Sequence, residues 1–284
     1  MKLNNIHLRE ISLNVCNIEK ISDYYQQTVG LVILSENNDE ILLGVKETKF
    51  PLVRLVQTDM TDHKKRSNGL YHMAIRVPNR TALGDFLYHL LLTETSIIGA
   101  SNHGYSEAIY LEDPEGNGIE VYCDKPFDEW DIRTDGRIVG ITEEIDARGV
   151  LDAAVRKSED SPFYLPEGTD MGHIHFSVSD VDSAKDTWIK LLGLEDKFSI
   201  PTGSWLAVGM YHHHVAFNEW GGKYLEKRQK NQPGLREFHI IVENQEEYDW
   251  IKKQASELGT VSVQEYQHEM LITDSFGITM RVEK

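Results

Sequence analysis

Apolar and polar residues alternate in four short segments of the chain, and each segment ends in an asparagine or an aspartate. These segments span residues 11–17, 72–79, 173–180 and 239–244. Such alternation predicts a strand with one buried face, and a terminal Asn or Asp is a good N-cap for a following helix. We therefore expect four strand-to-helix units that begin in the same way.

A helical pattern follows each cap, and strand-like runs follow each helix. The helical patterns cover residues 18–29, 80–92, 181–192 and 245–258. Three of them reach a glycine that we expect to end the helix, namely Gly30, Gly193 and Gly259. Runs compatible with three short strands come next, so the repeat is predicted to be a βαβββ module.

The interval between the second and third caps is longer than the other two, which indicates an inserted segment. We therefore expect an α+β protein with module 1 at residues 1–60, module 2 at 68–126, a connecting arm at 127–170, module 3 at 171–222 and module 4 at 233–284. One module cannot bury both its helix and its sheet face, so the modules should pair into two cup-shaped domains.

Composition and charge exclude several partners. The chain carries 29 Lys+Arg and 46 Asp+Glu, a net charge of −17, which disfavours nucleic acid. No apolar run approaches the roughly 18 to 20 residues that span a bilayer, and the N-terminus lacks a signal-peptide pattern. Cys16 and Cys123 are too few for a disulfide framework. We expect a cytoplasmic protein with no nucleic acid or membrane partner, and the oligomeric state, a homo-oligomer included, stays open.

The position seven residues before each cap starts the first strand of its module. It holds Glu10, His72, His173 and Glu237 in the four modules. Each of these side chains can ligate a metal ion. A single histidine at a strand start is more often a structural residue, but two histidines in equivalent positions favour a metal site.

Glu120 lies between two apolar residues in the run Asp113-Pro-Glu-Gly-Asn-Gly-Ile-Glu-Val-Tyr122. The alternation directs its carboxylate away from the helix-packed face and into the predicted cup. A buried carboxylate without a partner is costly, and a cation flanked by histidines would compensate it. Glu120 is therefore a candidate ligand, and an exposed strand-edge carboxylate is the alternative interpretation.

Four motifs together resemble the vicinal oxygen chelate superfamily of glyoxalases, bleomycin resistance proteins and extradiol dioxygenases. They are Gly69-Leu-Tyr-His-Met-Ala, the run ending in Tyr122, Gly172-His-Ile-His-Phe-Ser-Val-Ser-Asp180 and Gly209-Met-Tyr-His-His-His-Val-Ala-Phe-Asn-Glu-Trp220. The histidine triplet in a four-module chain is most similar to catechol 2,3-dioxygenase-like proteins. This resemblance implies a ring-cleaving dioxygenase that uses O2 and Fe(II), with Mn, Zn or Ni as other metals, on a small catechol-like or hydroquinone-like aromatic diol.

The resemblance also implies the ligand set, namely His72, Glu120 and His173. Two imidazoles and one carboxylate on one face leave about three coordination positions for a chelating diol and O2. This set assembles only when modules 2 and 3 share the metal-binding cup and modules 1 and 4 form the other. The competing arrangement pairs modules 1 and 2, brings in Glu10, leaves His173 apart and looks more like a glyoxalase-type isomerase.

By resemblance, His213 is the acid/base residue, and His103 and Tyr110 match positions that hydrogen-bond substrate and oxygen in the family. Strand alternation would place His212 and His214 on the side opposite His213. Periodicity does not say which of the two sets faces the cup, so the choice of His213 depends on the resemblance.

In the remaining cup, the positions equivalent to the ligands hold acids and bases. Glu10 and Arg54 have the same spacing as Glu237 and Arg281. An arginine cannot bind a cation, so we expect these four side chains to form ion pairs in place of a metal site.

Two other functions are compatible with the same motifs. One is a metal-dependent isomerase, lyase or thiol transferase that acts on a small chelating substrate, because the scaffold supports several chemistries. The other is a nonenzymatic protein that binds and sequesters a small aromatic compound. Four strong metal ligands would favour the first, and ligand binding without a metal would favour the second.

Overall fold

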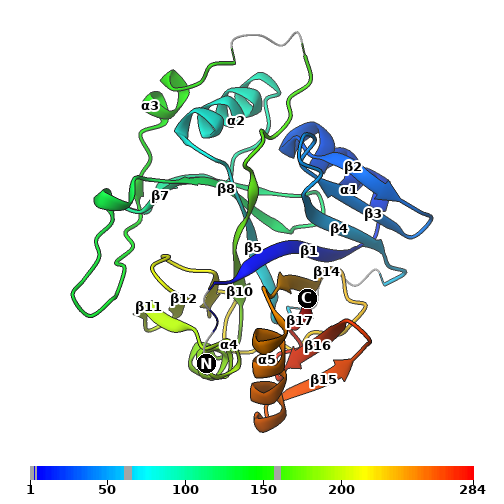
Figure 1. The fold of residues 1–284 in the computed structure, drawn as a ribbon. Coiled ribbons are helices and arrows are strands. Elements are labelled where there is room, and N and C mark those ends of the chain that lie inside the picture. Colours follow the sequence, from blue (N-terminus) through cyan, green and yellow to red (C-terminus); the bar gives the residue numbers. More distant parts are fainter. Residues whose placement is uncertain (1–2, 4, 61–65, 157–160) are drawn as a thin grey trace.

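The computed structural model describes residues 3, 5–60, 66–156 and 161–284, arranged as two curled sheets with helices packed on them (Figure 1). Residues 1, 2 and 4 of the predicted module 1 and residues 157–160 of the predicted arm lie outside the described residues. Among the described residues, no helix is both long and apolar enough to cross a membrane.

The elements follow one order in all four modules. Module 1 comprises β1 (His7–Val15), α1 (Ile18–Tyr24) with a π-helical extension η1 (Tyr25–Val29), β2 (Val32–Glu36), β3 (Glu40–Gly44) and β4 (Pro51–Gln57). Module 2 comprises β5 (Gly69–Arg76), α2 (Arg80–Leu92), β6 (Gly99–Asn102), β7 (Ser106–Glu112) and β8 (Gly118–Asp124). Module 3 comprises β10 (Asp170–Ser177), α4 (Val181–Leu192), β11 (Glu195–Ile200), β12 (Gly203–Ala207) and β13 (Val215–Asn218). Module 4 comprises β14 (Gly234–Ile241), α5 (Gln245–Glu257), β15 (Val261–Glu265), β16 (Glu269–Asp274) and β17 (Thr279–Glu283).

The four polar residues expected to start the helices do so. The side chains of Asn17, Asn79, Asp180 and Asn244 each accept a hydrogen bond from the backbone N–H three residues further on. Each bond satisfies a donor that the first turn of a helix leaves free. This shared cap explains why the strand-to-helix junction is so regular along the chain.

Two of the three glycines expected to end a helix adopt the left-handed conformation, with φ of 87° at Gly30 and 67° at Gly193. A side chain with a Cβ is disfavoured there. The expectation for Gly259 is wrong, because α5 already ends at Glu257 and Leu258 leaves the helix with an extended backbone.

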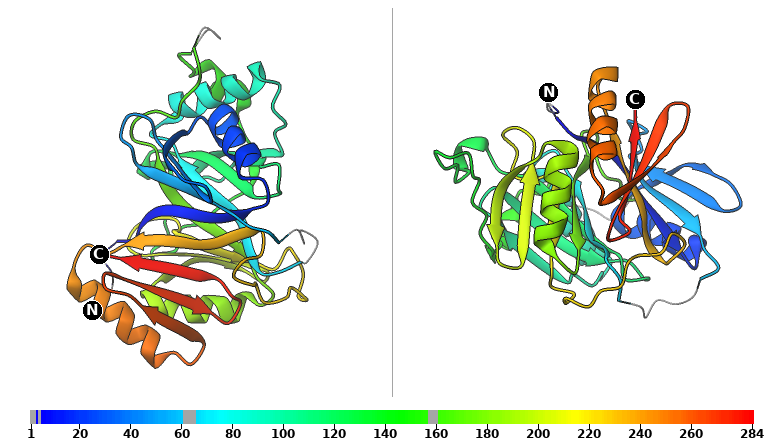
Figure 2. Two further views of the ribbon diagram at one scale, coloured as in Figure 1. Left: turned by 90° about the vertical axis from the view of Figure 1, so that its right-hand side faces the viewer. Right: turned by 90° about the horizontal axis from the view of Figure 1, so that it is seen from below.

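The first strands of the modules pair antiparallel and join the modules two by two. Strand β1 pairs with β14, which gives an eight-stranded sheet of order β15-β16-β17-β14-β1-β4-β3-β2. Strand β5 pairs with β10, which gives a nine-stranded sheet of order β11-β12-β13-β10-β5-β8-β7-β6-β9. Modules 1 and 4 therefore share one sheet and modules 2 and 3 share the other, as Figure 2 shows. The expected α+β architecture of βαβββ modules in two curled sheets is confirmed.

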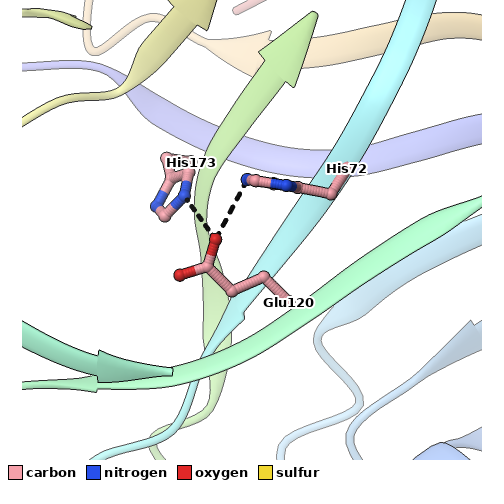
Figure 3. A group of neighbouring side chains, drawn as sticks. All are labelled: His72, Glu120 and His173. Carbon is pink, nitrogen blue, oxygen red and sulfur yellow. Dashed lines mark hydrogen bonds and ion pairs between the residues drawn. The ribbon is translucent and has the colours of Figure 1, made fainter. Parts of the chain in front are cut away.

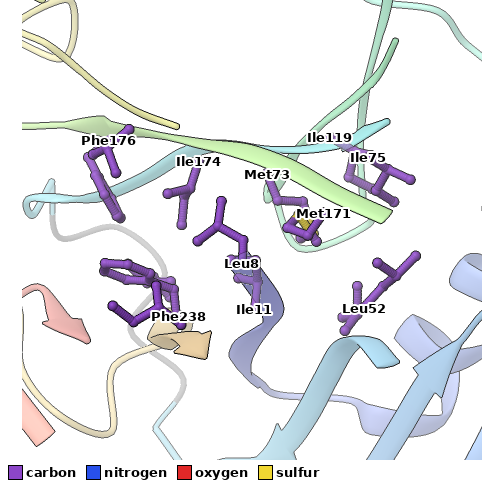
Figure 4. Close-up of a cluster of buried hydrophobic side chains, with 14 of the residues drawn as sticks. Leu8, Ile11, Leu52, Met73, Ile75, Ile119, Met171, Ile174, Phe176 and Phe238 are labelled. Atoms are coloured by element: carbon purple, nitrogen blue, oxygen red, sulfur yellow. The ribbon is translucent and has the colours of Figure 1, made fainter. Parts of the chain in front are cut away.

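An apolar core fills the space between the two sheets (Figure 4). Met73 of β5 and Ile174 of β10 meet Ile11 and Phe238 of the other sheet, and all four are fully buried. Burial of each such side chain stabilises the fold by about 1.5 to 3 kcal/mol. Because side chains alternate along a strand, the polar residues next to these positions point to the concave face of their own sheet.

The segment expected to be a connecting arm is partly built into the fold. It carries η2 (Phe127–Glu129), β9 (Glu143–Glu144) and α3 (Ala147–Asp152), and β9 pairs with β6 at the edge of the sheet. Helix α3 packs on α2 at Gly84, where a Cβ would collide with the carbonyl of Val150. The arm therefore extends the second module, and module 3 begins at Asp170, one residue earlier than expected.

Candidate metal centre

Three side chains from three adjacent strands converge in the concave face of the nine-stranded sheet (Figure 3). Nε2 of His72 on β5 lies 3.0 Å from Oε2 of Glu120 on β8, and Nε2 of His173 on β10 lies 3.2 Å from the same oxygen. The donor atoms of all three lie within 4.8 Å of one another. Among the described residues, this is the one group of at least three His, Cys, Asp or Glu side chains whose donors converge this closely.

The electrostatics of this group suit a divalent cation. Burial alone would raise the pKa of Glu120, but the interactions with His173 and His72 outweigh it and hold this pKa well below its usual range. Burial lowers the pKa of His173 to about 4, so its imidazole is neutral at neutral pH. The group thus offers a carboxylate and a neutral imidazole at 2% exposure each, which is a donor set for a metal ion.

A cavity of about 600 Å³ opens beside the three donors. Its lining is mainly apolar and includes Phe198, Ile200, Trp205 and Trp220 from module 3. The aromatic side chains contact one another, with ring centroids 5.4 Å apart for Phe198 and Trp205 and 5.2 Å apart for Tyr71 and Trp220. We call Tyr71, Phe198, Trp205 and Trp220 the aromatic wall.

His175 connects the aromatic wall to the metal donors. It lies two residues after His173 on the same face of β10, and its ring centroid is 4.9 Å from that of His72 and 5.6 Å from that of Trp220. Nδ2 of Asn218 lies 3.0 Å from its Nε2 atom. The sequence interpretation did not assign His175, although its spacing from His173 placed it on the same face.

His213 lines the cavity, and its ring centroid lies 4.1 Å from that of His173. The expected strand alternation around it is wrong, because β13 begins only at Val215 and the histidine triplet precedes it. His212 therefore lies beside His213, and their Nδ1 atoms are 2.7 Å apart. His214 points elsewhere, and its Nδ1 accepts a hydrogen bond from the backbone N–H of Val208. Neither His212 nor His214 is among the residues that line the cavity.

His103 and Tyr110 both line the cavity and contact each other. Nδ1 of His103 lies 2.9 Å from the carbonyl oxygen of Ile141, which only accepts, so Nδ1 carries a proton and donates it. The Tyr110 hydroxyl lies 2.6 Å from Nε2 of His103. Burial, with a smaller contribution from the charge of Glu120, raises the pKa of Tyr110 well above its usual value.

The arm forms part of the cavity wall, because its residues Gly140, Ile141 and Thr142 line the cavity. The sequence interpretation missed this contribution. Apolar residues at Ile138, Val139 and Ile141 were the available signal, since a solvent-exposed linker rarely carries three of them so close together.

The concave face of the other sheet holds charges in the equivalent positions. Arg54 occupies the position in module 1 that Glu120 occupies in module 2. Arg54 pairs with Ser12 on the first strand of its module, and Glu120 pairs with Ala74 on the first strand of its own. Nε of Arg54 lies 2.6 Å from Glu10, and Nε of Arg281 lies 2.8 Å from Glu237. The expected pairing of these acids and bases is confirmed.

His239 lies between the two carboxylates of this second face, 3.4 Å from Glu10 and 3.1 Å from Glu237. Burial alone would raise the pKa of Glu237, but His239 and Arg281 outweigh it and lower this pKa to about 2. A carboxylate with a depressed pKa stabilises the folded state above its unfolded pKa, and this contribution is lost as the pH falls toward 2.

Replacing Glu237 by glutamine therefore removes a pH-dependent contribution to stability. We expect the difference in unfolding free energy between the wild type and Glu237→Gln to shrink by about 2 kcal/mol between pH 7 and pH 3, because most of the Glu237 contribution is lost over that range. Urea unfolding at a series of pH values measures it. A difference that stays constant with pH would show that Glu237 is not held ionised by its partners.

Known proteins resemble this chain in sequence. The family model described as Glyoxalase/Bleomycin resistance protein/Dioxygenase superfamily matches residues 7–121. A catechol-2,3-dioxygenase from Bacillus subtilis (strain 168) is 31% identical over 272 residues, which cover 94% of this chain and 93% of that protein.

Solved structures share the fold. A putative dioxygenase from Bacillus subtilis subsp. subtilis str. 168 has a TM-score of 0.64 at 13% identity and covers 100% of this chain and 86% of its own. Glyoxalase I from Zea mays has a TM-score of 0.59 at 13% identity, over 98% of this chain and 92% of its own. The repeated modules, the converging donors and the catechol-2,3-dioxygenase relative lead to one conclusion: the chain belongs to the glyoxalase/bleomycin resistance protein/dioxygenase superfamily.

Proposed function

We propose that the protein is an extradiol dioxygenase that opens the ring of a catechol-like or hydroquinone-like diol with Fe(II) and O2. The observation that carries the proposal is the convergence of His72, Glu120 and His173 beside a largely apolar cavity. Two imidazoles and one carboxylate with open positions are the donor set of many non-haem Fe(II) oxygenases. The similarity to a protein named catechol-2,3-dioxygenase supports the same reaction class.

The residues present fit a resident divalent ion. Nε2 of His72 and Nε2 of His173 both face Oε2 of Glu120, over 3.0 and 3.2 Å, and all three side chains are buried. When bound here, Fe(II) would lower the pKa of a diol hydroxyl and supply the redox chemistry with O2. Mn, Zn and Ni suit the same ligands, so the availability of each metal contributes to which ion occupies the site.

The chain itself positions the substrate and handles its proton. His213 stands on the cavity wall next to His173, where it can accept a hydroxyl proton and return it later. The Tyr110 hydroxyl and Nε2 of His103 lie 2.6 Å apart on the cavity lining, where a hydroxyl can both donate and accept a hydrogen bond to the substrate. The apolar lining excludes water and orients the ring.

The size of the cavity favours a diol that carries an apolar substituent. At about 600 Å³ it lies in the range of pockets that hold drug-sized ligands, whereas catechol is a single six-membered ring. The aromatic wall is the part of the lining that suits an aryl or alkyl group, because aromatic side chains stack on apolar rings.

Replacing Trp205 by alanine should therefore reduce activity selectively. We expect kcat/KM for an aryl-substituted catechol to fall on the order of 10-fold, and kcat/KM for catechol to change by less than about threefold, since an apolar contact contributes about 1 to 3 kcal/mol. Steady-state kinetics on both substrates measure the ratio. Trp250→Ala on α5, remote from the cavity lining, is the control. An equal loss on both substrates would contradict a role in binding the substituent.

Oxygen uptake tests the proposed reaction. Protein reconstituted anaerobically with Fe(II) should consume O2 when catechols are added and should form a ring-opened product that contains both oxygen atoms. The same protein loaded with Zn should bind the diol without consuming O2, because Zn has no redox chemistry. Absence of uptake across catechols and hydroquinones with a full complement of Fe(II) would refute the proposal.

A second candidate, supported by the aromatic wall, is a nonenzymatic protein that sequesters a small aromatic compound. Such a protein binds its ligand through the wall alone. Isothermal titration before and after chelation distinguishes a dioxygenase from a binding protein. A dioxygenase should lose most of its affinity for the diol when the metal is removed. Unchanged affinity after chelation, together with no O2 uptake, would favour the binding protein.

A metal-dependent isomerase, lyase or thiol transferase finds less support in the geometry. The converging group contains three donors, and His213 is not part of it. A fourth strong ligand would leave less room for a chelating diol and O2.

A further inference from the structure

Three side chains form a hydrogen-bonded row that leads from the cavity wall toward the protein surface. His213 lines the cavity, and its Nδ1 lies 2.7 Å from Nδ1 of His212. Nε2 of His212 lies 3.0 Å from Oδ1 of Asp124. The two imidazoles are 4% and 1% exposed, and the Asp124 side chain is 22% exposed. Neither Asp124 nor His212 lines the cavity, and the row of hydrogen bonds connects both of them to His213, which does.

The carboxylate determines where the protons of both imidazoles lie. Ionised Asp124 only accepts hydrogen bonds, so Nε2 of His212 carries a proton and donates it. With the Nε2 proton of His212 directed at the carboxylate, the lone pair on Nδ1 of the same ring faces Nδ1 of His213. The proton of the short contact then belongs to Nδ1 of His213. Among the described residues, Nε2 of His213 has no hydrogen-bond partner, so it keeps a free lone pair.

We infer that Asp124 and His212 are positioning residues that hold His213 in the Nδ1–H tautomer, with an unprotonated Nε2 available to the cavity. The catalytic consequence rests on the proposed function. When a diol binds, the O–H bond of its hydroxyl breaks, an N–H bond forms at Nε2 of His213, and the electron pair stays on the substrate oxygen. With the opposite tautomer, Nε2 would already carry a proton and could not accept this one.

Arg76 determines how an asparagine at position 124 would be oriented. Oδ2 of Asp124 accepts hydrogen bonds from Arg76 over 3.3 Å and from the Tyr211 hydroxyl over 3.1 Å. A guanidinium group has donors only, so the amide oxygen of the replacement must face Arg76 and its NH2 group must face His212. That NH2 group donates to Nε2 of His212. Asp124→Asn should therefore reverse both tautomers and place a proton on Nε2 of His213.

Nuclear magnetic resonance measures the tautomers directly. Long-range proton–nitrogen correlation spectra of nitrogen-15 histidine-labelled protein, loaded with diamagnetic Zn, distinguish protonated from unprotonated ring nitrogens. We expect protonated Nδ1 and unprotonated Nε2 for His213 in the wild type, and the reverse in Asp124→Asn. The reverse pattern in the wild type, a doubly protonated His212, or unchanged tautomers in the variant would overturn the inference. The wild-type spectrum is decisive by itself if the variant does not fold.

Kinetics of the Fe(II) protein provide a second readout. Asp124→Asn should lower kcat on the order of 10²- to 10⁴-fold and change KM by less than about threefold, because the general base is present in the wrong tautomer. Asp170→Asn is the matched control, since Asp170 also binds Arg76, at 2.6 Å, and loses the same charge. The control should keep both the tautomers and kcat. An equal fall in the control would attribute the effect to charge and overturn the inference.

The two readouts separate this inference from the proposed function. The expected tautomers without O2 uptake on any diol would refute the dioxygenase and leave the positioning of His213 intact. Ring cleavage by a wild type with the reverse tautomers would refute the positioning and leave the dioxygenase intact.

Discussion

Replacing Glu120 by glutamine is expected to remove the metal ion and the ring-cleaving activity together. The carboxylate contributes the one negative charge of the converging group, and both imidazoles contact its Oε2 atom. A neutral amide neither balances a divalent cation nor binds it strongly. We expect metal content to fall by at least about tenfold, and the increase in melting temperature on metal addition to disappear, because only a bound ligand stabilises the folded state.

Glu107→Gln is the matched control for this change. Glu107 is also a buried carboxylate of module 2, but it lies on β7 and pairs with Arg80 over 2.7 Å. The control loses its ion pair with Arg80, yet it should keep its metal and its activity. Full metal content in Glu120→Gln would contradict the assignment of this ligand.

Replacing His213 by asparagine is expected to leave the metal in place and to lower kcat on the order of 10²- to 10⁴-fold, the usual contribution of a general acid or base. The amide can still donate to His212 but presents no lone pair of comparable basicity to the cavity. Metal analysis and steady-state kinetics on the same preparation measure both quantities.

His214→Asn is the control for the neighbouring position. His214 is 6% exposed and accepts a hydrogen bond from Val208, which an amide oxygen can replace. Its kcat should stay within about threefold of the wild type, as expected for a change away from the cavity. A similar fall in both variants would show that the histidine triplet supports the fold of this segment, and that His213 is not the acid/base residue.

Much of the fold could be predicted because each module repeats the same local signals. Asn79 and Asp180 end alternating segments, start helices through their side chains and so mark equivalent strands. The equivalent positions seven residues earlier are His72 and His173, which the structure brings onto neighbouring strands β5 and β10. Glu120 reaches the same point because alternation along β8 directs it to the concave face.

The remaining features depend on contacts between segments far apart in the sequence. Asp124 ends β8 without any recognisable motif, and its partner His212 lies in an irregular segment before β13. Alternation predicts directions only within a strand, so it failed at the histidine triplet. Trp205 and Trp220 come from different parts of module 3, and Ile141 comes from the arm. No local pattern indicates that they share a cavity.

The most direct test of the account is a crystal structure of the Fe(II)-loaded protein with anomalous diffraction measured on both sides of the iron absorption edge. The account predicts one iron peak, within bonding distance of Nε2 of His72, a carboxylate oxygen of Glu120 and Nε2 of His173. An iron bound elsewhere, or bound by only one of the two central modules, would contradict it.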